Sequence, residues 1–217
     1  TDATICVVKI FDHAQPTKLS DLLGAFDSII QDFHTHGSRC AVVNMSWTIP
    51  YNQYISDKIA IMAAEGIFMV AAAGNSGEPI ENITPASVPT AIVVGAYNQN
   101  LEPCNFSNYT GPIENTPMPV NTGELDGWAP GDQIWVALLN GQYGFIGGTS
   151  SAAAITSGAV AYDLHILTTT SSGTLWGIDT PLDSGLVLSV TNNMFSKDNM
   201  LLLAGLYADS ANRVAVY

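Results

Sequence analysis

The chain has 217 residues, of which 47% are hydrophobic and only 12% are charged, and its net charge is −13 at pH 7. This size and apolar content fit one large domain with a sizeable core. Only six residues are Lys or Arg and no apolar run approaches the roughly 18–20 residues that span a bilayer, so neither nucleic acid nor a membrane is an expected partner.

Short apolar strands alternate with amphipathic helices through the first hundred residues. Apolar residues recur at helical spacing from Leu19 to Phe33 and from Ile55 to Met62, and Gly37 and Gly66 follow as stop signals. Because strands that alternate with helices form βαβ units, the sequence predicts an α/β fold with a mainly parallel sheet. The strands are predicted at the β-branched, apolar runs Ile5–Phe11, Ala41–Trp47, Ile67–Ala73 and Ala91–Ala96.

The second half of the chain is less regular. Residues 101–143 contain five prolines, which predicts loops. A helix of small residues is predicted from Ser150 to about Leu167. The tail from Thr168 is weakly patterned, with one further strand or short helix predicted over Leu201–Leu206.

Ser150 lies where this last helix is predicted to begin, in the stretch "GGTSSAAAITSG". A serine at a helix N-terminus is near unpaired backbone N–H groups and the positive end of the helix dipole, which favours a nucleophile with an oxyanion beside it. The alternative is an N-capping serine on a tightly packed helix.

Asn75 directly follows the third predicted strand, in "AAAGNSG". A side-chain amide at the carboxyl edge of a sheet can supply one oxyanion donor, with the backbone N–H of the nucleophile as the other. The alternative is a turn-forming Asn-Ser-Gly.

Six stretches in order, from about Thr4 to about Leu167, resemble the subtilisin-like serine protease family. They read "VVNMSW", "VAAAGNSG", "TPASVPTAIVVGA", "NFSNYTG", "DGWAPG" and "GGTSSAAAITSG". The resemblance implies a subtilisin-like three-layer sandwich that is incomplete in this chain. Residues 1–217 would form a single partial catalytic domain, of which residues 168–217 resemble the family poorly.

The same resemblance assigns roles to individual residues. It makes Ser150 the nucleophile, Asn75 the oxyanion donor and Pro85 a cis proline. No acid falls at the floor of the primary specificity pocket by motif, which favours an uncharged substrate side chain. The pocket would be bordered by Ser46, Trp47 and Thr48 on one side and by Ala72, Ala73 and Gly74 on the other, with both segments binding an extended peptide by strand addition.

The family's Asp and His motifs, of the form D-[ST]-G and H-G-T-H, belong upstream of Ile5, and neither is present. His34 and His36 in "FHTHG" nearly spell the second motif, but they close a predicted helix far from the strand ends, where cationic capping is the better interpretation. His165 lies about 20 Å along the helix from Ser150. His13 follows a predicted strand and is interpreted as a loop residue rather than a base.

The sequence therefore predicts a two-chain, heterodimeric protease made from a processed precursor. An N-terminal chain of the same precursor would supply the catalytic Asp and His. It would also cover the apolar strand Ile5–Phe11, because an exposed apolar edge invites aggregation. The substrate would be a peptide or protein.

Two departures from the family pattern keep an alternative open. The family usually has Pro and often His at the positions of Ala154 and Ile155. The alternative is a catalytically inactive, subtilase-like binding, assembly or toxin subunit.

Cysteines and sequons bear on location. Cys6, Cys40 and Cys104 allow one disulfide plus an odd thiol, which would be free to bridge to a second chain, or three free thiols. Four N-x-[ST] sequons begin at Asn44, Asn82, Asn105 and Asn108; the last three lie in polar stretches and favour a secreted, extracellular glycoprotein, whereas Asn44 is predicted to be buried in a strand.

The predicted chemistry requires no cofactor or metal. No His/Cys cluster predicts zinc, and structural calcium, which is frequent in the family, has no assignable ligands here.

Overall fold

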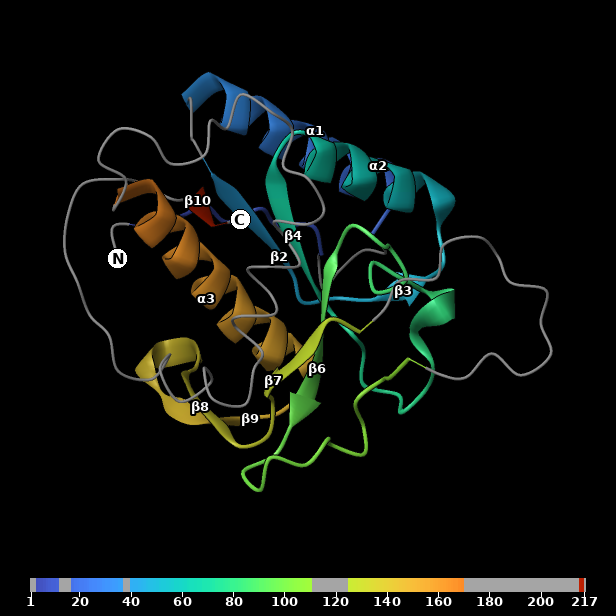
Figure 1. The fold of residues 1–217 in the computed structure, drawn as a ribbon, viewed down its shortest axis with the longest axis vertical. Coiled ribbons are helices and arrows are strands. Elements are labelled where there is room, and N and C mark those ends of the chain that lie inside the picture. Colours follow the sequence, from blue (N-terminus) through green and yellow to red (C-terminus); the bar gives the residue numbers. More distant parts are fainter. Residues whose placement is uncertain (1–2, 12–16, 37–39, 111–124, 170–214, 217) are drawn as a thin grey trace.

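The computed structural model describes residues 3–11, 17–36, 40–110, 125–169 and 215–216 (Figure 1). The helices are α1 (Leu19–His36), α2 (Gln53–Ala64) and α3 (Thr149–Thr169), with short 3-10 turns η1 (Ile80–Asn82) and η2 (Leu139–Gly141). The strands are β1 (Thr4–Ile5), β2 (Ala41–Met45), β3 (Ile49–Pro50), β4 (Ile67–Ala72), β5 (Ile83–Thr84), β6 (Ile92–Tyr97), β7 (Gly127–Pro130), β8 (Ile134–Ala137), β9 (Tyr143–Ile146) and β10 (Ala215–Val216).

The central sheet has six strands in the order β1-β10-β2-β4-β6-β7, and every neighbouring pair is parallel. Its centre is the β2–β4 pair, which is in register from Ala41 opposite Ile67 to Met45 opposite Ala71. Two small antiparallel pairs, β3–β5 and β8–β9, lie outside this sheet. Because all central strands run the same way, their carboxyl ends meet at one edge.

The sheet separates two apolar layers because side chains alternate along each strand. Val43 and Met69 face the cluster formed with α1 and α2, whereas Val42 and Val70 face the cluster formed with α3. Figure 1 shows α1 and α2 on one side of the sheet and α3 on the other. The expected three-layer, mainly parallel α/β sandwich is thus confirmed.

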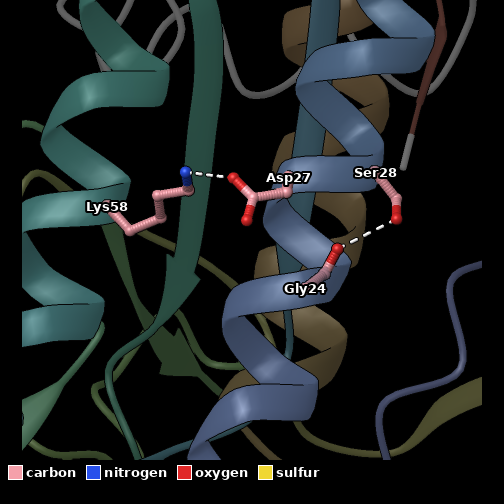
Figure 2. A network of polar contacts seen from close by, with 4 residues as sticks. All are labelled: Gly24, Asp27, Ser28 and Lys58. Carbon is pink, nitrogen blue, oxygen red and sulfur yellow. Dashed lines mark hydrogen bonds and ion pairs between the residues drawn. The ribbon is translucent and has the colours of Figure 1, made fainter.

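Local signals account for the helix layer. Asn52 caps α2, since its side-chain oxygen accepts a hydrogen bond from the backbone N–H of Ile55 at 3.1 Å. The helix ends before Gly66, whose positive φ of 88° suits a glycine after a C-cap. On α1, Asp27 forms an ion pair with Lys58 of α2, and Ser28 donates to the Gly24 carbonyl at 2.9 Å (Figure 2).

The prediction for the N-terminal strand is wrong in extent and burial. Only Thr4–Ile5 form a strand, and Ile5 and Val7 are 78% and 88% exposed. β1 lies at the edge of the sheet beside β10, and the described residues supply no strand on its other side. Val8 and Ile10 are partly buried and pack against the core cluster that includes α1 and α2. The strand β10, between β1 and β2, was not predicted.

The other helices and strands that the sequence predicted are present where the structure describes them. Strands β7 and β8 fall within residues 101–143, which were predicted as loops, and β9 begins at the last residue of that stretch. Gly37 and Leu201–Leu206 lie outside the described residues. The Thr84–Pro85 peptide is cis, as expected. In the described part of the chain, no helix combines the length and apolar character needed to cross a membrane.

Candidate active site

Ser150 is the second residue of α3 and is half-buried at the carboxyl edge of the sheet. In the first turn of a helix the backbone N–H groups lack intrahelical acceptors, so they remain available to an anion. The Ser150 hydroxyl donates to the Ser46 carbonyl oxygen at 3.1 Å. This contact holds the hydroxyl beside the end of β2.

Asn75 follows β4 and is brought to the same place by Thr149, the residue before Ser150. The Asn75 Oδ1 accepts hydrogen bonds from the Thr149 backbone N–H at 2.8 Å and from its hydroxyl at 2.9 Å. A backbone N–H can only donate, so the oxygen of the amide must face Thr149 and the Nδ2 group must face away. That Nδ2 lies 3.3 Å from where a Cβ on Gly148 would be.

The Thr149 hydroxyl has a second role, because it also accepts from the Gly74 backbone N–H at 3.1 Å. Thr149 is fully buried. The single side chain therefore joins the turn that carries Asn75 to the turn that carries Ser150. A shift of either turn would break a buried hydrogen bond, which fixes their relative position.

A chain of hydrogen bonds connects Ser150 to Asn44 of β2. Asn44 of β2 donates from Nδ2 to the Ser46 hydroxyl at 2.9 Å, and that hydroxyl donates to the Ser150 carbonyl at 2.9 Å. The Asn44 Oδ1 accepts from the Ser157 hydroxyl of α3 at 3.1 Å. Asn44 is thus half-buried, rather than fully buried as its strand pattern predicted, and it ties β2 to α3.

The predicted pocket residues occupy two segments beside this site. Ala72, Ala73 and Gly74 are buried at the end of β4, and Ser46 bonds to Ser150 as described. Thr48 is exposed and lies close to Gly74, with its Cγ2 3.6 Å from a Cβ position there. The Trp47 ring packs against Phe11 and Phe26, at centroid distances of 6.2 and 6.5 Å, on the α1 side. The specificity role of these residues stays a prediction.

A hollow of about 400 Å³, here called the 48–83 hollow, opens beside Thr48. One wall is the segment from Thr48 through β3, and the other is the loop from Glu78 to Ile83. The β3–β5 pair joins the two walls, with Ile49 opposite Thr84. The lining residues are Thr48, Ile49, Pro50, Glu78, Pro79, Asn82 and Ile83.

Asn108, which the sequence singled out only as a sequon within the stretch "NFSNYTG", has a structural role. Its Oδ1 accepts from the backbone N–H groups of Ser76 at 2.9 Å and Glu78 at 3.1 Å, and its own backbone N–H donates to the Gly74 carbonyl at 3.0 Å. It is 0% exposed. Gly74, with φ of 105°, leaves room for it, since a Cβ there would lie 2.4 Å from the Asn108 Nδ2. Asn108 therefore shapes the turn around Asn75.

The histidines do not complete a catalytic group in the described part of the chain. His34 pairs with Glu65 at 3.3 Å on the outer helix layer, and the Ser150 hydroxyl bonds to a carbonyl. His36 lies at the end of α1 and His165 is the seventeenth residue of α3, and His13 falls outside the described residues. Over the described ranges, no group of three or more His, Cys, Asp or Glu is arranged to hold a metal.

A family model of the subtilases, "Subtilase family", matches residues 1–170. The chain belongs to the subtilase family. The cuticle-degrading protease of Metarhizium anisopliae is 31% identical over 156 residues, or 71% of this chain. A subtilisin-like protease of Coccidioides posadasii is 39% identical over 160 residues, or 73% of the chain. The aligned part covers 37% of each of these relatives, so this subtilase chain spans well under half of their length.

Solved structures give the same fold. A cold adapted subtilisin-like serine proteinase superposes with a TM-score of 0.59 at 28% identity, over 69% of this chain and 49% of that one. The prenylagaramide maturation protease PagA superposes with a TM-score of 0.54 at 26% identity, over 72% of this chain and 54% of that one. The subtilase architecture is therefore confirmed for the described residues.

Two of the sequons of this subtilase are unsuited to a glycan in the folded chain. Asn108 is buried with its oxygen bonded to two backbone groups, and Asn44 is bonded within β2 and to α3. Asn82 and Asn105 are exposed. Asn108 looked like a loop residue because its stretch is polar, and nothing in the local pattern revealed that the loop folds over it.

The three cysteines, all among the described residues, form no disulfide with one another: Cys6 is half-buried and Cys40 and Cys104 are buried. Burial, with a smaller contribution from Asp132, raises the pKa of the Cys104 thiol. A buried thiol with a raised pKa is less reactive, because the thiolate is the nucleophile.

Proposed function

We propose that this chain is the Ser- and Asn-bearing part of a serine endopeptidase that hydrolyses peptide bonds through an acyl-enzyme. The observation that carries the proposal is the buried Thr149 link, which fixes Asn75 beside Ser150. A helix-capping serine or a turn-forming asparagine would need no such connection across 74 residues. The relatives named as proteases support the same reaction.

In the proposed mechanism, the Ser150 hydroxyl leaves the Ser46 carbonyl and attacks the scissile carbonyl carbon while a histidine takes its proton. The negative charge that develops on the substrate oxygen is stabilised by the Asn75 Nδ2 and the Ser150 backbone N–H. The histidine then protonates the leaving amine, and water hydrolyses the acyl-enzyme by the same steps in reverse order. These steps use protein groups and water.

The histidine and its orienting aspartate are proposed to come from an N-terminal chain of the same precursor, which would form a heterodimer with this one. Two observations support this. In the described residues the Ser150 hydroxyl contacts a carbonyl and no histidine. The N-terminal edge exposes Ile5 and Val7, which are apolar side chains that a partner strand would cover.

The substrate is proposed to be a peptide or protein in extended conformation, bound along Ser46–Thr48 and Ala72–Gly74 by strand addition. A secreted, extracellular location is proposed from the exposed sequons at Asn82 and Asn105. On this proposal a glycan would be carried at those two positions and not at Asn44 or Asn108.

The proposal is tested by co-expressing this chain with the N-terminal part of its precursor and measuring hydrolysis of a quenched fluorescent protein substrate. Hydrolysis should occur in the complex and be lost in Ser150→Ala. Ser151→Ala is the matched control, because the neighbouring hydroxyl is buried in α3 and should be dispensable. Reducing and non-reducing gels of the same complex show whether a disulfide joins the two chains.

The alternative is an inactive subtilase-like binding, assembly or toxin subunit. It is favoured by Ala154 and Ile155, which lie in the first two turns of α3 where the family usually has Pro and often His. A tight complex that hydrolyses no substrate, with or without Ser150→Ala, would establish this alternative instead.

A further inference from the structure

The 48–83 hollow adjoins the nucleophile and has a defined shape. Thr48 on its wall is two residues from Ser46, whose carbonyl accepts from the Ser150 hydroxyl at 3.1 Å. Two residues of extended chain span at most about 7 Å. A substrate side chain next to the bond that Ser150 attacks can therefore reach this hollow.

The walls of the hollow are held in place by backbone contacts. Pro50 of β3 pairs with Ile83 of β5, and the Tyr51 backbone N–H donates to the Asn82 carbonyl at 2.9 Å. Glu78 is fixed on both sides, because its N–H donates to Asn108 at 3.1 Å and its carbonyl accepts from the Tyr109 N–H at 3.2 Å. The position from which the Glu78 carboxylate extends is thus set before a substrate binds.

The chemistry of the lining combines apolar contact with one negative charge. Ile49, Pro50, Pro79 and Ile83 are apolar, Thr48 and Asn82 are neutral, and Glu78 is the ionisable residue among the lining set. The whole chain has a net charge of −13. The local and overall fields therefore favour a cation.

We infer that the 48–83 hollow binds a Lys or Arg side chain of the substrate, with the Glu78 carboxylate as its counter-ion. The inference rests on the proposed function and names its substrate class. Long basic side chains place methylene groups on apolar surface and keep the charged end near water, which matches apolar walls with an exposed acid. An acidic side chain would be repelled, and a leucine would leave Glu78 unpaired.

This differs from the uncharged preference that the motifs favoured. Glu78 lies three residues beyond Asn75, outside the matched stretch, and it lines the hollow because the loop turns back over Asn108 and β5 pairs with β3. The spacing of residues in the sequence did not indicate that this loop turns back toward β3.

The experiment uses the co-expressed complex and four peptides that differ only in the residue before the scissile bond: Lys, Arg, Leu or Glu. We expect kcat/KM for Lys and Arg to exceed that for Leu by about tenfold, which corresponds to about 1.4 kcal/mol, and Glu to be the poorest. Glu78→Gln should remove most of the advantage of the Lys and Arg peptides over the Leu peptide. Because Glu78 is exposed, the advantage should also shrink at high salt.

Glu81→Gln is the matched control, since Glu81 is close in sequence but is not among the lining residues. Rates are expressed per active site by titrating Ser150 with a fluorophosphonate. A labelled, active complex that cleaves Leu peptides as well as Lys peptides, or a Glu78→Gln variant with unchanged selectivity, overturns this inference alone. A complex that neither reacts with the fluorophosphonate nor cleaves any of the four peptides refutes the proposed function, and this specificity with it.

Discussion

The two sides of the central sheet, divided at β2, differ in the length and the burial of their strands. On one side, β2, β4 and β6 are five or six residues long, almost wholly buried, and end at the Ser150–Asn75 site. On the other side, β10 and β1 are two residues long, and Ile5 of β1 is 78% exposed. The first region holds its own core and its own polar connections. In the second, Val8 and Ile10 pack against the core, whereas Ile5 and Val7 are exposed.

The difference shows which part of the structure is held together by contacts within this chain. Among the described residues, the buried Thr149 and Asn108 hold Asn75 in position relative to Ser150. The N-terminal edge carries Ile5 and Val7, which are exposed in the described chain. We therefore expect mutations in the two regions to behave differently in the chain alone and in its complex.

The largest contrast between the two regions should be in the free energy of unfolding. Met69 is fully buried in β4, so Met69→Ala should lower the free energy of unfolding by about 2–5 kcal/mol through lost burial and a cavity. Ile5→Ala should change it by less than about 0.5 kcal/mol in the chain alone. Urea unfolding measures both. A large loss for Ile5→Ala in the isolated chain would mean that β1 is already part of a packed core.

At the nucleophile edge, Asn75→Ala should lower kcat of the complex by about 10²–10³, or roughly 2.7–4 kcal/mol, and change KM little, because the lost donor acts on the transition state. Asn100→Ala, in an exposed loop, is the control and should keep full activity. Steady-state kinetics separate the two constants. An equal rise in KM would assign Asn75 to substrate binding rather than to oxyanion stabilisation.

Asn108→Ala should cost about 1–3 kcal/mol of stability, since the backbone N–H groups of Ser76 and Glu78 would lose their buried acceptor. The exposed Asn105 in the same loop is the matched position, and Asn105→Ala should have almost no effect. Thermal unfolding of both variants checks this. Equal midpoints for the two variants would show that Asn108 does not support the turn.

The smallest effect should be a pH dependence within α3. Burial raises the pKa of Asp163 above its ordinary value of 3.8, so the fold disfavours the carboxylate. Its favourable contribution is complete below pH 3.8 and is lost as the pH rises through the raised pKa. Asp163→Asn should therefore be slightly more stable than the parent at pH 7, with the difference vanishing near pH 3. Unfolding midpoints over this range would show the opposite trend if Asp163 were stabilised as a carboxylate.

The sequence predicted the centre of the molecule well because signals there are local. The β-branched runs that form β2, β4 and β6 are short and bounded by turns, and the apolar stripes of α1 and α2 have a clear helical period. The family landmarks around Asn75 and Ser150 lie just after β4 and at the start of α3. A pattern of this kind specifies which face is buried without knowledge of distant residues.

What could not be predicted depends on neighbours far along the chain. Ile5–Phe11 has the composition of a core strand, but burial requires partners on both sides, and composition does not supply them. Strands β8 and β9 form a hairpin outside the central sheet, in which Trp135 stacks on Tyr143 with a ring-centroid distance of 6.3 Å. Their aromatic side chains are exposed and are not part of the core. The roles of Asn108 and Glu78 arise from loops that meet only in three dimensions.

The most direct test of the central claim is fluorophosphonate labelling of Ser150, mapped by mass spectrometry, in this chain alone and in its complex with the N-terminal chain of the precursor. The account predicts labelling at Ser150 in the complex, its loss in Ser150→Ala, and little or none in the chain alone, because the base comes from the partner. Equal labelling of the isolated chain, or no labelling of a stable complex, would contradict it.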